Sequence, residues 1–83
     1  MLTILIGRAT TLVDKIVQHH PNLPTEATRN CIEAGEIRVG LEILCDNLFE
    51  LEIRVPPEVS SQLIGLCEDV RVEQQYWLDV VTR

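Results

Sequence analysis

Apolar residues recur at steps of three and four along most of this chain, the spacing that places them on one face of an α-helix. The first stripe lies within residues 2–18 and is followed by His19, His20 and Pro21. A proline directly after such a run ends a helix, and the helix dipole favours histidines near a C-terminus. We therefore predict a first helix over residues 2–18 with one core-facing stripe. That stripe comprises Leu2, Leu5, Ile6, Ala9, Leu12, Val13, Ile16 and Val17.

Two more helices are predicted in the middle of the chain. Within residues 21–35, Pro24 suits a first helical turn and Gly35 is a good C-terminal stop, so we expect a turn and then a short helix. From about Glu36 to Leu51 the apolar spacing is again helical.

The last part of the chain predicts a fourth and a fifth helix. Pro56 forbids continuation of the third helix, and Pro57 can open a fourth over residues 57–69. A break near Val70 and Arg71 precedes a short fifth helix. The residues expected to dock these two helices on the core are Val59, Leu63, Ile64, Leu66 and Cys67, then Tyr76, Trp77, Val80 and Val81.

Residues 53–55 and 70–72 are rich in valine and leave short strands as an alternative. Neither run is long enough to alternate convincingly, so helices are favoured throughout. We predict an all-α fold, a small bundle of four to five helices, as one domain over residues 1–83.

The third predicted helix carries an unusual row of acids. At about 100° per residue its core seam is Ile37, Leu41, Leu44 and Leu48, with Cys45 beside them. Glu42, Asp46 and Glu50 follow one another at every fourth position on another face, where like charges cost roughly 0.2–0.5 kcal/mol per pair. Val39 and Ile43 lie among these acids. This outer face either packs under another helix with its charges reaching solvent, or is a surface that binds a partner.

The net charge of −6, from 7 bases and 13 acids, narrows the class of partner. Nucleic acids and anionic membranes bind through clustered Lys and Arg, so we expect neither, and a basic protein is the natural electrostatic partner. No run approaches the roughly 20 apolar residues that span a bilayer, and the N-terminus lacks the basic region and cleavage site of a signal peptide. A cytoplasmic protein is expected.

Catalytic and metal-binding patterns are weak. Cys31, Cys45 and Cys67 are odd in number and far apart, without zinc-ligand spacing. His19 and His20 are adjacent, so on a helix they point about 100° apart and do not converge. We found no nucleophile beside a base and no Gly-rich phosphate loop. The sequence therefore predicts no enzymatic activity, cofactor or metal.

A denser motif covers residues 33–58. It runs through Gly35-Glu36, Leu41-Glu42, Leu44-Cys45-Asp46-Asn47-Leu48, Phe49 and Glu50, and a late Trp77 accompanies it. This segment resembles the Maf-type immunity proteins of bacterial polymorphic toxin systems. Their recurring core is Gly-Glu, then Ala-Leu-Glu, then Leu-Cys-Asp, a polar residue, Leu, an aromatic and Glu. Gly40 stands where that family usually has Ala.

The resemblance implies a protein that neutralises a cognate toxin C-terminal domain, often a basic nuclease, by stoichiometric contact. An acidic helix face could cover the basic substrate groove of such a toxin. The contact set that we predict comprises Glu36, Glu42, Asp46 and Glu50, the flanking acids Glu33 and Glu52, and the apolar anchors Val39 and Ile43.

Two alternatives stay open. The toxin contact could instead lie on the first or last helix, for example around Asp69, Glu73 and Asp79. The protein could also be a homo-oligomeric helical adaptor without a toxin partner, with the apolar first helix as its dimer interface.

Overall fold

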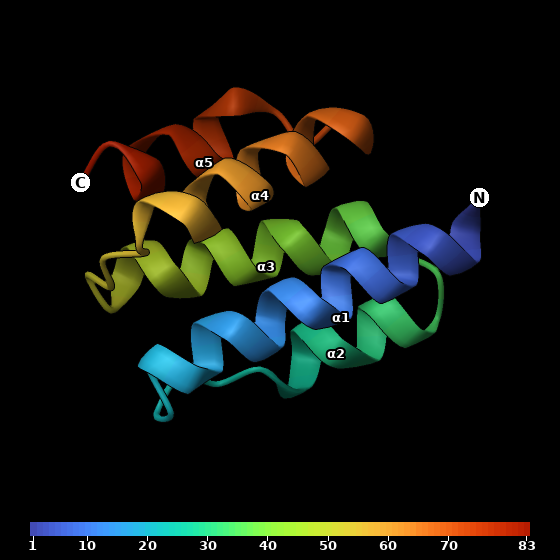
Figure 1. The fold of residues 1–83 in the computed structure, drawn as a ribbon, viewed down its shortest axis with the longest axis horizontal. Helices are drawn as coiled ribbons and strands as arrows, with labels where there is room; N and C mark the ends of the chain where they lie inside the picture. Colours follow the sequence, from blue (N-terminus) through green and yellow to red (C-terminus); the bar gives the residue numbers. More distant parts are fainter.

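The computed structural model describes all residues, 1–83, and consists of five α-helices joined by short turns (Figure 1). The all-α prediction is confirmed, and the valine-rich segments contain no strand. Predicted and observed helix bounds differ by at most about one residue where the prediction gave both ends. The helices are α1 (Leu2–His19), α2 (Glu26–Glu33), α3 (Ile37–Glu50), α4 (Pro57–Asp69) and α5 (Gln74–Val81).

Helix α3 runs through the middle of the molecule, with α1 and α2 on one side and α4 and α5 on the other (Figure 1). The α2 and α5 helices pack directly against α3, and α1 packs against α4. The molecule measures 31 × 24 × 20 Å, and the two termini lie at opposite ends of its longest axis. The middle helix is therefore covered from several sides, and only its remaining face is open.

Three of the helices end in the same hydrogen-bonded turn. Gly35, Glu52 and Arg71 follow α2, α3 and α4 with positive φ angles of 82°, 53° and 63°. In each turn the N–H of the positive-φ residue and the N–H of the residue after it donate to carbonyls near the end of the helix, as Glu36 does to Cys31 at 2.8 Å. This pattern satisfies the last carbonyls of a helix and normally uses glycine, so Glu52 and Arg71 hold a costly backbone conformation.

The core consists of the apolar helix faces that the spacing predicts. The side chains of Leu41, Leu44 and Leu48 on α3 are fully buried. Leu63 on α4 is fully buried as well, and Leu12 on α1 is nearly so. The prediction was wrong at Leu2, which is 51% exposed. Its Cδ atoms lie beside the turn at Gly35 instead of the core, because α1 begins beyond the edge of the neighbouring helices.

Gly40 explains how closely α2 approaches α3. A Cβ atom there would lie 3.2 Å from the carbonyl oxygen of Thr28 and 3.2 Å from Cγ1 of Ile32, with the Cβ of Cys31 at 3.3 Å. The missing side chain therefore lets the two helices pack backbone against backbone.

Candidate functional site

The outer face of α3 points away from the buried seam and is open to solvent. Val39 is 38% exposed, and Asp46 and Glu50 are exposed on the same face. Glu42 and Ile43 flank them and are half-buried. The structure thus brings these five predicted contact residues together on one side of one helix, which we call the α3 outer face.

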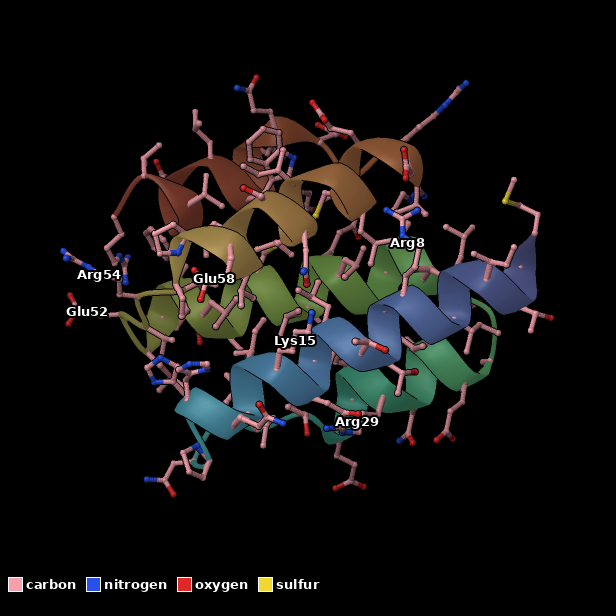
Figure 2. All side chains as sticks on the ribbon, in the orientation of Figure 1. Arg8, Lys15, Arg29, Glu52, Arg54 and Glu58 are labelled. Carbon is pink, nitrogen blue, oxygen red and sulfur yellow. The ribbon has the colours of Figure 1, made fainter.

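The other three predicted residues lie beyond the two ends of this helix. Glu33 is the last residue of α2 and Glu36 immediately precedes α3, whereas Glu52 follows α3 in the turn before α4. All three are exposed. Figure 2 shows Glu52 at one end of the molecule with Arg54 nearby. Five of the eight predicted residues therefore share the α3 outer face, and Glu52 is separated from Glu33 and Glu36 by the whole helix.

Only one of the predicted contact acids makes an ion pair. Nε of Arg38 lies 3.9 Å from a carboxylate oxygen of Glu42, one helical turn away. The side chain of Glu42 retains 24% of its exposure, so it is both partly covered and partly neutralised. Asp46 and Glu50 make no ion pair; the other two pairs are Arg8–Asp69 and Arg29–Asp14. The uncompensated charge of α3 is thus concentrated at Asp46 and Glu50.

The predicted contact set omitted Phe49. Its ring is 48% exposed, and the guanidinium carbon of Arg83 lies 5.1 Å from the ring centroid. Nη1 of Arg83 also donates to the carbonyl oxygen of Phe49 at 3.3 Å. The sequence carried a signal for this exposure, because a residue next to Leu48 points about 100° away from the core seam. The α3 outer face is therefore bordered by an aromatic ring that could anchor a partner.

The buried thiols offer no reactive group. Cys45 and Cys67 are both fully buried, on α3 and α4. A hydrogen bond with the Cys67 side chain and then burial raise the pKa of the Cys45 thiol far above its usual range. A thiol held in its protonated form is a poor nucleophile. No three His, Cys, Asp or Glu side chains gather in a geometry that could hold a metal ion.

The two histidines contact backbone oxygens at the end of α1. A ring nitrogen of His19 lies 3.0 Å from the carbonyl oxygen of Lys15, and one of His20 lies 3.1 Å from that of Arg54. The second contact ties the end of α1 to the segment before α4. Both rings thus make structural contacts.

Comparison of the chain with protein-family models, with curated proteins and with solved structures found no match. None of the five helices combines the length and apolar character needed to cross a membrane.

Proposed function

We propose that this protein is an immunity protein that binds a cognate bacterial toxin domain, basic and nuclease-like, through the α3 outer face and neutralises it stoichiometrically. The observation that supports the proposal most is the combination of the unpaired acids Asp46 and Glu50 with exposed Val39 on that face and exposed Phe49 at its border. The motif resemblance over residues 33–58 supports a bacterial toxin domain as the partner.

The charge pattern has a physical rationale in such a complex. Asp46 and Glu50 are one turn apart, and like charges at this spacing destabilise a helix by roughly 0.2–0.5 kcal/mol. A cationic partner surface removes that repulsion on binding. Opposite potentials also steer the encounter, which raises association rates by about 10–10³-fold and makes them salt-dependent. Exposed apolar side chains between the acids then supply the contact area.

The test is co-expression with the toxin C-terminal domain encoded directly upstream, followed by affinity measurements at low and high salt. We compare the double variant Asp46→Lys and Glu50→Lys with Asp79→Lys, an exposed acid on α5. We expect the α3 variant to weaken binding by at least about 100-fold while urea denaturation shows little change in folding stability, since both side chains are exposed.

The control variant also tests the alternative interface. A loss of affinity with Asp79→Lys and none with the α3 variant would move the toxin contact to the last helix. Equal losses of affinity and stability in the α3 variant would contradict the proposal, because the acids would then serve the fold.

The adaptor alternative also has an observation in its favour. The start of α1 exposes large apolar side chains: Met1 is 89%, Leu2 51% and Ile4 63% exposed. A stable self-assembly that forms no complex with the upstream toxin domain would favour this function over immunity.

A further inference from the structure

A groove of about 560 Å³ lies between α1 and α4. Small residues form its floor and walls, including Gly7 and Thr11 on α1 and Ser61 and Gly65 on α4. A Cβ atom added at Gly7 or Gly65 would meet nothing within 4 Å. These two glycines therefore do not serve close packing inside the monomer, unlike Gly40. They leave room for something that approaches from outside.

The two helices that flank this groove carry opposite charges, the basic ones on its lining and the acidic ones beyond its two ends on α4. Arg8 and Lys15 belong to α1, and Glu58 and Asp69 belong to α4. Within the monomer Arg8 pairs with Asp69 at 2.7 Å, but Lys15 reaches only Oε1 of Gln62, at 3.1 Å. Glu58 lies one turn before Gln62 and has no ion-pair partner. Figure 2 shows Arg8, Lys15 and Glu58 on the face that α1 and α4 share.

We propose that this face binds a second copy of the chain, with a two-fold axis running along the groove. In that dimer α1 of each protomer lies against α4 of the other. Lys15 then faces Glu58 and Gln62 of the second copy, and Arg8 faces Asp69. The small residues Gly7 and Gly65 allow the helices to approach closely, and exposed Ile4 adds apolar area at the edge of the interface.

The charges select this axis over the other simple arrangement. A two-fold axis perpendicular to the groove would stack α1 on α1 in opposite directions. Lys15 would then approach Arg8 of the second copy, and the acids of the two α4 helices would meet likewise. Like charges facing each other across an interface disfavour that pairing. With the axis along the groove, each helix meets a helix of opposite charge.

The proposed dimer is independent of toxin binding. No residue of α3 lines the groove, and the α3 outer face lies opposite the buried seam of that helix. Each dimer would thus leave two α3 outer faces free. The interface is limited to one face of two helices per protomer, so we expect a dissociation constant on the order of micromolar.

Mixing two complementary variants tests the proposal. Lys15→Glu places glutamate against Glu58 in its homodimer, and Glu58→Lys places lysine against Lys15. Sedimentation should show that each variant alone dissociates about tenfold or more readily than the wild type, because two attractive contacts become repulsive. An equimolar mixture restores opposite charges at both contacts, so it should form a heterodimer of wild-type affinity.

The outcomes separate contacts between protomers from contacts within one. Charge interactions confined to the monomer cannot be rescued by mixing, so a mixture that stays dissociated overturns the proposal. A Lys15→Glu variant that dimerises more tightly overturns the chosen axis. A wild-type protein that remains monomeric at several hundred micromolar overturns the dimer itself.

A third variant probes the groove without changing any charge. Gly65→Gln places a good helix former where the monomer has free space, so thermal unfolding should show a monomer at least as stable as the wild type. The same side chain fills the groove, and sedimentation should show the dimer lost. Retention of the dimer by this stable variant would exclude the groove as the interface.

Discussion

The close approach of α2 to α3 makes Gly40→Ala a sharp test of the packing. On an isolated helix the change would stabilise by up to about 1 kcal/mol, because glycine is the poorer helix former. In this protein the new methyl group would lie 3.2 Å from the Thr28 carbonyl oxygen and 3.3 Å from the Cβ of Cys31. Both atoms are fixed to the α2 backbone, so relief requires movement of the whole helix.

Overpacking of this kind costs typically about 1–3 kcal/mol, which exceeds the propensity gain. We therefore expect Gly40→Ala to lower the free energy of unfolding by about 0–2 kcal/mol in urea denaturation. Gly65→Ala is the matched control, measured at concentrations that keep the protein monomeric. Its methyl group meets nothing within 4 Å, so it should raise stability by about 0.5–1 kcal/mol.

The opposite signs of the two glycine variants are the decisive result. Equal stabilisation by Gly40→Ala and Gly65→Ala would show that α2 yields freely, and would refute the argument that Gly40 is required for helix contact.

Two further predictions concern stability. The pKa of Cys45 is raised in the folded chain, so the unfolded chain loses the thiol proton near pH 9.0 while the folded chain keeps it. The free energy of unfolding is therefore unaffected below that pH and falls above it by about 1 kcal/mol per pH unit. Urea denaturation at pH 8 and pH 10 should show a smaller loss of unfolding free energy for Cys45→Ala than for the wild type. Glu52→Gly and Arg71→Gly should each raise the unfolding free energy by about 0.5–1 kcal/mol, because glycine adopts a positive φ without strain. If Glu52 contacts the toxin, Glu52→Gly should also lose affinity for it and Arg71→Gly should not. A melting temperature that rises in neither variant would contradict the backbone strain assigned to Glu52 and Arg71.

Helix positions could be predicted from the sequence because local residues end each helix. Gly35 adopts the positive φ that glycine tolerates, and Pro57 opens α4 at its first residue. The position of the break at Arg71 was predicted, but its positive φ was not, since an arginine gives no local signal for a left-handed turn. Leu2 shows the limit of periodicity, which assigns a side chain to a stripe and does not say where the neighbouring helix ends.

The candidate site was predicted in part for the same reason. Spacing along α3 predicts that Val39, Asp46 and Glu50 share one face but leaves open whether another helix covers it, and the structure shows all three exposed. The weak Arg38–Glu42 pair and the stacking of Arg83 on Phe49 depend on side-chain geometry, and the second joins residues 34 positions apart. The groove between α1 and α4 likewise arises only when distant segments meet, so no pattern within either helix predicts it.

The pairing of α1 with α4 also bears on the order in which the molecule forms. Helices α2 and α3 are separated by three residues and meet as neighbours in the chain, whereas the Arg8–Asp69 contact closes a loop of 61 residues. Closing a long loop costs more entropy than closing a short one, so the local α2–α3 pair is favoured as the early folding unit. The α1–α4 interface would then form last and open first, because its exposed Arg8–Asp69 ion pair and Lys15–Gln62 hydrogen bond are weak contacts. Amide hydrogen exchange would record this as earlier opening along α1 than along α3.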